Sequence, residues 1–389
     1  MMKNNLIISA FSLGLLTLVN TSCENAENPE IANMVYFSEA TSAKAKVITL
    51  ESQDVSTSLT VRLAKAIDSD VNVTIAIDES VLADYNYKNE TDYKVVDAAN
   101  MDIPSKSIVS AGAVSAEPTV INIHSFNTHG SQYAIPVRIT SVDGQVDRAE
   151  ASSKFIFILE QPLIQPVPTF HANNKMKASP ETEWGLTLSN YTLEWWSKMS
   201  GFRLNNQAIF YCAMSDTELS IRFGDEIYGR GVFNFLQIKA LGKQFDTGDP
   251  GKGFGLNANT WYHFALTYDA STGTAKIYKN GEEVASMAGE VGKSYTFNSM
   301  ALICSGTTWF VDACELAQVR MWKTTRSAGQ IKANMNKTID ATNKDLVLYL
   351  PMDEGSGTTL NDITGNGHDT VIGNNGTSSS VTWNEYTFK

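Results

Sequence analysis

Apolar and polar residues alternate along several short segments of this chain, and this pattern restricts the fold more than any other feature. The segment "LTVRLAK" places Leu59, Val61 and Leu63 on one side and Thr60 and Arg62 on the other. The segments "VNVTIAID" and "YAIPVRIT" repeat the alternation, and "KFIFIL" closes the set. Because side chains alternate across a strand, such segments bury one face and expose the other. The sequence therefore predicts an all-β protein.

The strand patterns fall into two groups separated by prolines. The chain has 389 residues, of which 43% are hydrophobic, and this is enough for two or three domains with real cores. Residues 34–160 predict an Ig-like β-sandwich of unknown function, in which Pro136 suggests an edge strand. Residues 161–168, "QPLIQPVP", predict a stiff extended linker. Residues 169–389 predict a second sandwich, so the fold expected is two tandem β-sandwiches.

Local sequence signals define a hairpin and a helix in the second domain. In "AKIYKNGEEV", Asn280 and Gly281 predict a two-residue turn between two strands. Ser327 is a suitable N-cap for one short helix over residues 327–336, although Gly329 weakens it. Residues 246–255, "DTGDPGKGFG", do not match a phosphate loop, because Lys252 is followed by glycine.

The first 22 residues have the composition of a secretion signal. Lys3 precedes the apolar run of residues 6–19, which is too short for a membrane-spanning helix. The small residues Thr21 and Ser22 then precede Cys23, and this stretch resembles the lipobox of bacterial lipoproteins, although Asn20 departs from the usual aliphatic residue. The resemblance implies cleavage before Cys23, lipid attachment to its sulfur and a membrane anchor. The alternative is an ordinary signal peptide with an incidental cysteine.

Acidic residues set the expected location and partners. Glu24, Glu27 and Glu30 lie in the predicted tether, residues 23–33, and resemble surface-export signals of Gram-negative lipoproteins. We therefore expect a lipid-anchored protein of the outer membrane, facing the cell surface. The net charge of −12 repels phosphate backbones, so nucleic acid is not expected as a partner.

The three remaining cysteines leave two interpretations open. Cys304 and Cys314 flank a short segment and could form a disulfide in an exported protein, with Cys212 left over. Alternatively, all three are small buried apolar residues. None belongs to a CxxC pair, so the sequence does not support a zinc site.

Both domains resemble known families. The segments "VNVTIAIDESVLADYN", "IPSKSIVSAGAVSAEPTVINI" and "YAIPVRIT" resemble a domain of unknown function found at the N-terminus of surface lipoproteins from glycan-foraging gut bacteria. The segments "YTLEWW", "ELAQVRMWKTTRSAGQI" and "LYLPMDEGSGTTLNDITGNGHD" resemble the laminin-G-like, concanavalin-A-like jelly roll. The last piece often opens the domain in that family, whereas here it closes it. The resemblance implies an accessory glycan-binding lipoprotein.

A glycosidase would need two carboxyl groups on one strand face, about 5–5.5 Å apart in a retaining enzyme. Asp225 and Glu226 are adjacent, which places them on opposite faces of an extended segment. Asp312 and Glu315 have no third acid nearby in the sequence. We therefore expect a protein that is not an enzyme.

One loop of the second domain resembles the opening of a calcium loop. The segment "DITGNGHD" supplies oxygen ligands at Asp362, Thr364, Asn366 and Asp369, which suit calcium. The closing glutamate is missing, because position 373 is glycine. The alternatives are a calcium site, the one cofactor that the sequence suggests, and a simple glycine-rich turn.

Candidate ligand-binding residues are aromatic or polar side chains on the wet side of a strand or in a polar loop. Flat rings stack on the C–H faces of sugars, and Trp196 is the apolar residue out of place on the polar side of its strand. Packing at the core edge is the alternative role for such tryptophans. The candidates are Trp196, Trp261, His263 and Arg320 on the strands, and Tyr228 and Arg230 in a glycine-rich loop.

The most consistent function is non-catalytic glycan binding at the cell surface. The alternative is a protein-binding or adhesion module of an outer-membrane complex, with an importer as a possible partner, and a glycoside hydrolase is less favoured. The surroundings of Trp196 separate these hypotheses. A groove favours sugar, a flat apolar patch favours protein, and two nearby carboxylates favour catalysis.

Overall fold

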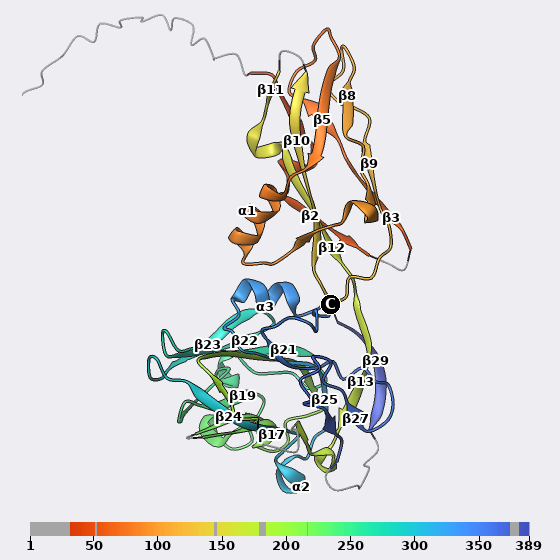
Figure 1. The fold of residues 1–389 in the computed structure, drawn as a ribbon. Helices are drawn as coiled ribbons and strands as arrows, with labels where there is room; N and C mark the ends of the chain where they lie inside the picture. The colour runs from red at the N-terminus through yellow and green to blue at the C-terminus, as the bar shows by residue number, and fades with distance from the viewer. Residues whose placement is uncertain are drawn as a thin grey trace, which may run out of the picture.

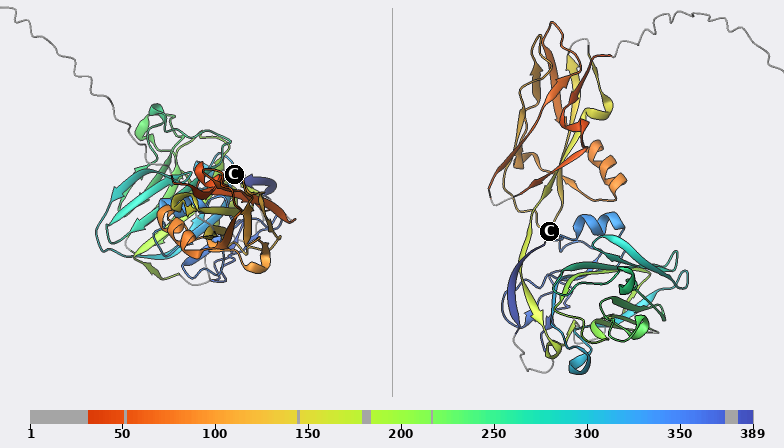
Figure 2. Two further views of the ribbon diagram at one scale, coloured as in Figure 1. Left: turned by 90° about the horizontal axis from the view of Figure 1, so that it is seen from above. Right: turned by 180° about the vertical axis from the view of Figure 1, so that it is seen from behind.

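The computed structural model describes residues 32–50, 53–143, 146–178, 184–215, 217–373 and 381–388. Strands dominate it, which confirms the predicted all-β fold, and they form two domains stacked end to end (Figure 1). Helices α1 (Glu79–Asn89) and α3 (Ala328–Asn334) lie on either side of the junction between the domains (Figure 2). Among the described residues, no helix is long and apolar enough to cross a bilayer.

The N-terminal domain consists of three sheets around one core. Its strands are β1 (Met34–Phe37), β2 (Ala45–Thr49), β3 (Val55–Leu59), β4 (Val61–Leu63), β5 (Val71–Ile77), β6 (Lys94–Val95), β7 (Met101–Asp102), β8 (Lys106–Val109), β9 (Thr119–Ile123), β10 (Tyr133–Asp143), β11 (Asp147–Arg148) and β12 (Lys154–Glu160). The sheet orders are β11-β1-β4, β3-β9-β7 and β2-β12-β10-β5-β8, with β6 also paired to β10. In β5, Val71, Val73 and Ile75 are buried and Asn72 is exposed, as the alternation predicts.

Pro136 lies in the interior of its sheet, so the prediction of an edge strand is wrong. Its strand, β10, pairs with β12 on one side and with β5 and β6 on the other. The β6 pairing ends at Ala134 and the β5 pairing begins at Val137. The carbonyl of Pro136 accepts a hydrogen bond from Asp78 N on that side, so the missing N–H also points there, into the gap between the two ladders.

The C-terminal domain is a sandwich of two large sheets. Its strands are β13 (Leu163–Phe170), β14 (Met176–Ala178), β15 (Leu186–Leu188), β16 (Asn190–Met199), β17 (Gln207–Met214), β18 (Glu218–Phe223), β19 (Leu236–Ala240), β20 (Lys243–Asp246), β21 (Tyr262–Asp269), β22 (Thr274–Lys279), β23 (Glu282–Ala288), β24 (Tyr295–Leu302), β25 (Cys314–Trp322), β26 (Leu346–Leu350), β27 (Thr359–Leu360), β28 (Thr370–Val371) and β29 (Thr382–Phe388). One sheet has the order β23-β22-β21-β16-β25-β13-β29, with β26 paired to β25, and we call it the upper sheet because its outer face points to the N-terminal domain. The other sheet has the order β14-β24-β17-β18-β19-β20, with β15 paired to β24, and β27 pairs with β28.

Short helices complete both domains. They are α2 (Gly306–Trp309) and the 3-10 helices η1 (Glu39–Thr41), η2 (Ala98–Asn100), η3 (Glu150–Ser152), η4 (Ala172–Asn174), η5 (Glu226–Tyr228) and η6 (Pro250–Lys252). The core of the C-terminal domain lies between its two sheets, where Trp195 of β16 packs edge-on against Phe210 of β17. The apolar faces of both sheets therefore meet as amphipathic strands require.

The proline-rich segment is part of a sheet, which corrects the prediction of a stiff extended linker over residues 161–168. It forms most of β13, which pairs with β29 from Leu163 to Thr169. Pro166 and Pro168 occupy alternate positions, so both lack an N–H on the same side of the strand. On its other side, β13 pairs with β25 only at Thr169 and Phe170, beyond the prolines. The chain thus passes from β12 of one domain almost directly into a strand of the next.

Two local predictions are confirmed. Asn280 and Gly281 connect β22 to β23, and both have positive φ angles, as a tight hairpin turn requires. Ser327 caps α3, and its side chain accepts a hydrogen bond from Gln330 N while the Gln330 side chain bonds back to Ser327 N. This reciprocal capping box explains why a seven-residue helix containing Gly329 forms here.

Candidate functional site

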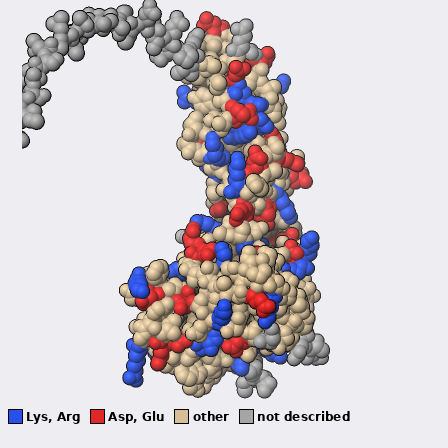
Figure 3. All heavy atoms as spheres, turned by 90° about the vertical axis from the view of Figure 1, so that its left-hand side faces the viewer, with Lys and Arg blue, Asp and Glu red and all other residues tan. Residues whose placement is uncertain are grey.

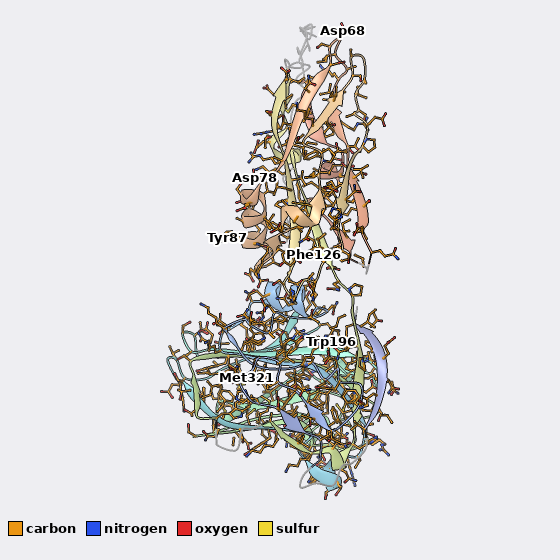
Figure 4. The ribbon with its side chains drawn as sticks, turned by 45° about the vertical axis from the view of Figure 1, so that its right-hand side comes forward. Asp68, Asp78, Tyr87, Phe126, Trp196 and Met321 are labelled. Atoms are coloured by element: carbon orange, nitrogen blue, oxygen red, sulfur yellow. The ribbon has the colours of Figure 1, made fainter. Side chains whose placement is uncertain are left out.

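The outer face of the upper sheet holds most of the predicted ligand-binding residues. Trp196 of β16 lies opposite His263 of β21 and Ala317 of β25, while its neighbour Trp195 points into the core. Figure 4 places Trp196 on the side of the C-terminal domain that faces the N-terminal domain, with Met321 deeper in the sandwich. The predicted division of β16 into two faces is therefore confirmed.

The outer face is covered rather than open. Trp196 is only 5% exposed, and its indole N–H donates a hydrogen bond to the carbonyl of Met335, just after α3. His263 and Arg320 are fully buried below α3 and the segment that follows it. This corrects the expectation that His263 and Arg320 contact a ligand directly, because neither side chain reaches solvent.

These two residues belong to a buried polar cluster that supports the sheet. Glu194 lies at its centre, with Oε1 accepting a hydrogen bond of 2.6 Å from the indole of Trp322 and lying 3.9 Å from the guanidinium groups of Arg320 and Arg326. The pKa of His263 is lowered to about 4, chiefly by burial, with Glu194 opposing the shift and the two arginines contributing to it. His263 is therefore neutral at pH 7 and serves the packing of the domain.

Tyr228 and Arg230 lie on the other side of the sandwich. Tyr228 ends η5, its hydroxyl donates a hydrogen bond to Asp246 Oδ1, and its ring packs edge-on against Phe235. The pKa of Tyr228 is raised to about 12, chiefly by burial and then by the bond to Asp246. Arg230 is exposed in the loop that follows. The structure does not bring these two residues together with Trp196.

An open pocket remains at one edge of the upper sheet. It has a volume of about 560 Å³ and is lined by Trp196, Trp261, Asn280, Met335, Tyr386, Thr387 and Phe388. We call it the aromatic pocket. Trp261 is 9% exposed and Tyr386 is 36% exposed, and their ring centroids lie 5.1 Å apart at an interplanar angle of 37°. Two of the predicted residues thus meet in one site, together with β29, which the sequence did not single out.

Polar groups surround the rings of this pocket. The indole N–H of Trp261 has no hydrogen-bond partner among the described residues. Asn280 Oδ1 accepts a hydrogen bond from His263 N, which leaves its amide nitrogen to donate to a ligand. Lys198 Nζ lies 5.4 Å from the ring centroid of Trp261 and forms an ion pair with Glu315. The pocket therefore combines flat apolar faces with a few donors, which is the usual chemistry of a small-ligand site.

The predicted calcium ligands come together in one turn beside a second cavity. This cavity has a volume of about 420 Å³, and its lining includes Thr364 and Asn366. The rings of Trp184 and His368, which are in contact with each other, also line it. Asp362 lies below it, and its oxygens accept hydrogen bonds from Tyr349 N and from Thr364. Burial alone would raise the pKa of Asp362, but bonds led by that from His368 lower it.

Two further oxygens of this turn are also used internally, since Asp369 Oδ1 accepts from Asp362 N and Thr364 Oγ1 accepts from Asn366 N. Asn366 Nδ2 donates to the carbonyl of Val347. In the part of the chain that the structure describes, no group of three or more His, Cys, Asp and Glu residues is arranged to hold a metal ion. Calcium binding at this turn stays a prediction from the sequence.

The cysteines of the C-terminal domain are free thiols, so the predicted disulfide between Cys304 and Cys314 is wrong. Cys304 Sγ donates to the carbonyl of Ala208, while Cys314 is fully buried at the start of β25. Burial raises the pKa of Cys304 to about 12 and also raises that of Cys314. The three thiols, including Cys212, act as small core residues. Cys23, the predicted lipid attachment site, lies outside the described residues.

Three of the four acids considered for catalysis are engaged by a cation. Asp312 forms an ion pair with Arg203, and Asp225 forms one with Arg222. Glu315 is paired with Lys198, as noted above. A carboxylate held by a cation is a poor general acid, because the charge stabilises its ionised form.

Comparisons with known proteins agree with this architecture. Residues 171–332 match the family model of the concanavalin A-like lectin/glucanases superfamily, and residues 29–146 match a model described only as an N-terminal domain. A Bacteroides ovatus protein, whose carbohydrate-binding role is itself inferred, is 23% identical with a TM-score of 0.57, and the match covers 92% of this chain and 98% of that one. No curated protein matches the sequence.

Two further solved structures are less similar. A pentraxin from Limulus polyphemus is 14% identical, covers 58% of this chain and 95% of its own, and has a TM-score of 0.32. A Bacteroides thetaiotaomicron protein, EndoBT-3987, is 20% identical over 33% of this chain and 30% of its own, with a TM-score of 0.29. The C-terminal domain of the protein thus matches the concanavalin A-like lectin/glucanases superfamily, and it follows an N-terminal domain that matches a second, separate family model.

Proposed function

We propose that the protein binds carbohydrate without cleaving it and that the aromatic pocket is the binding site. The observation that carries this proposal is the pairing of Trp261 with Tyr386 at an open pocket that Asn280 and Thr387 also line. A pyranose ring has apolar C–H faces surrounded by hydroxyl groups. Aromatic faces and single donors suit both features.

The surroundings of Trp196 favour sugar binding over protein binding. Trp196 lies at the base of a concave pocket rather than on a flat apolar patch, which speaks against a protein-binding face. The glycan-binding role inferred for the Bacteroides ovatus protein of the same fold supports the proposal.

Replacement of Trp261 by alanine is expected to weaken binding of a glycan selected on an array by at least about tenfold. The reason is that stacking on an aromatic side chain is worth roughly 1–3 kcal/mol for a nucleic-acid base, and we expect the C–H face of a sugar to contribute a similar amount. Isothermal titration calorimetry with the selected glycan measures the loss.

The matched control is Trp309→Ala, because Trp309 is 42% exposed in α2 and lines neither the aromatic pocket nor the second cavity. Equal losses in both variants would place the site elsewhere. A wild-type protein that binds no glycan but retains a stoichiometric protein partner would replace the proposal by the adhesion hypothesis.

We also propose that Cys23 anchors the protein in the outer membrane. The first described strand, β1, lies at the end of the N-terminal domain far from the C-terminal domain (Figure 1). An anchor that precedes this strand would leave the aromatic pocket away from the membrane. Metabolic labelling with an alkyne fatty acid should mark the wild-type protein and not Cys23→Ala, which should also leave the membrane fraction. Label retained by Cys23→Ala would refute the anchor.

A further inference from the structure

A third pocket, distinct from the cavity beside Thr364, adjoins the aromatic pocket and lies between the two domains. It has a volume of about 450 Å³ and shares Thr387 and Phe388 of β29 with the aromatic pocket. Its other lining residues come from both domains: Thr49, Tyr93, Glu160, Gln161 and Pro162 on one side, and Lys332, Ala333, Asn336 and Lys337 on the other. We call it the junction pocket. A bound ligand that extends from the aromatic pocket past Thr387 therefore reaches a space that the N-terminal domain helps to form.

Close backbone contacts fix the two domains around this pocket. A Cβ atom at Gly329 of α3 would lie 2.3 Å from the carbonyl oxygen of Asn89 at the end of α1. A Cβ atom at Gly130 would lie 2.4 Å from the carbonyl carbon of Ile339. Only glycine permits such approaches between the domains. The junction pocket is therefore formed before any ligand binds.

The buried side chain of Lys337 links the domains beside the pocket. Its Nζ lies 3.7 Å from Glu160 Oε1, 3.4 Å from the hydroxyl of Tyr93 and 5.2 Å from the centroid of the Tyr93 ring. This contact holds the Tyr93 ring at the wall of the pocket. The ring is therefore positioned by the junction itself.

The charges that line the two pockets are already balanced. Among the described residues that line the aromatic pocket, none has a charged side chain. In the junction pocket, Lys337 is paired with Glu160, and Lys332 is paired with Glu282 at 2.5 Å. The lining offers uncharged hydrogen-bonding side chains instead, including Gln161, Asn336 and Thr387. Such a surface recognises hydroxyl groups rather than a carboxylate or a sulfate.

We infer that one uncharged oligosaccharide occupies both pockets and that the N-terminal domain supplies part of its binding site. This inference rests on the proposed function of the aromatic pocket. The aromatic pocket holds one part of the chain, and the Tyr93 ring and the Gln161 amide contact the next. Gln161 Oε1 accepts a hydrogen bond from Thr128, which leaves its amide nitrogen to donate. The N-terminal domain is then more than a spacer.

The test uses mannan, xylan and glucan fragments, each as a short and a long oligosaccharide, together with polygalacturonate fragments as acidic probes. Tyr93→Ala should weaken binding of the long neutral fragment by about tenfold, the loss expected for a residue worth a little over 1 kcal/mol. Binding of the short fragment should stay unchanged. Trp261→Ala should weaken both, because it removes the primary stacking face.

The control is Tyr87→Ala, since Tyr87 is 87% exposed on α1 and is not among the residues that line the junction pocket. Gln161→Ala provides a second variant of an exposed residue, in case Tyr93→Ala lowers the melting temperature of the N-terminal domain. If both leave the long fragment unaffected while Trp261→Ala abolishes binding, the proposed function stands and the shared site is refuted. Tighter binding of the polygalacturonate fragments than of the neutral fragments refutes the inference that the ligand is uncharged. Absence of all binding by the wild type refutes the proposed function as well.

Discussion

Replacement of Glu194 by glutamine is expected to destabilise the C-terminal domain by about 3–5 kcal/mol, the usual loss when one partner of a buried ion pair is removed. Glutamine keeps the shape of the side chain and an oxygen that can accept from the indole of Trp322. It removes the only negative charge within 4 Å of Arg320 and Arg326 among the described residues. Two buried guanidinium groups then lose their nearest counter-charge. Burial already lowers the pKa of Arg326, and Glu194 opposes that shift.

Thermal and urea unfolding of the two proteins measure this loss. A loss of this size corresponds to a fall in melting temperature of roughly 10 °C for a domain of this length. Glu283→Gln is the matched control, because Glu283 forms a half-exposed ion pair of 2.8 Å with Lys276 on the same sheet. Such exposed pairs contribute about 0–1 kcal/mol. Similar losses in both variants would show that the buried cluster does not depend on the charge of Glu194.

The charged side chains on the surface are exposed, whereas those of the cluster around Glu194 are buried. On the face shown in Figure 3, acidic and basic side chains are interspersed over both domains. Exposed charges of this kind are screened by water and salt, whereas those around Glu194 are not. Charge changes inside the C-terminal domain should therefore have the larger effects on stability.

Local patterns in the sequence were sufficient to predict the elements that depend on neighbouring residues. The turn at Asn280 and the capping box that starts at Ser327 depend on residues within a few positions of each other. The helix α1 was missed, although Asp78 caps it by accepting from Ser80 N. The sequence did not distinguish this short helix from the strands around it. An apolar run followed by polar residues is equally consistent with a strand and a loop.

The site could be predicted only in part, because alternation shows which side chains share a face but not what covers that face. Trp196 and His263 were correctly placed on one side of the upper sheet, yet α3 covers that side. Tyr386 and Phe388 line the aromatic pocket because β29 pairs with β13. The paired residues are more than 200 positions apart in the sequence. Pairing over such a distance depends on the whole fold and leaves no local signal.

Acid is expected to destabilise the C-terminal domain through His263. The pKa of His263 is lowered from 6.5 to about 4 in the folded protein, chiefly by burial, so the native state keeps the ring neutral. As the pH falls from 6.5 to 4, the unfolded chain takes up a proton that the folded chain does not. Stability is therefore fully present above pH 6.5, decreases through this window and becomes constant below it. The total loss is about 3 kcal/mol, since one pKa unit corresponds to 1.36 kcal/mol.

Comparison with His263→Gln isolates this effect from that of the carboxylates. Glutamine cannot take up the proton, so the difference in unfolding free energy between the two proteins should change by about 3 kcal/mol between pH 7 and pH 4, with wild type losing more. His124 offers a matched control, because it is exposed and its pKa is raised, mainly by its hydrogen bond to Asp54. The stability that His124 contributes is fully present in acid and is lost as the pH rises, so His124→Gln should not reduce the acid-linked loss. A constant difference between wild type and His263→Gln across this range would mean that His263 is accessible to protons in the native protein, and that the outer face of the upper sheet is open after all.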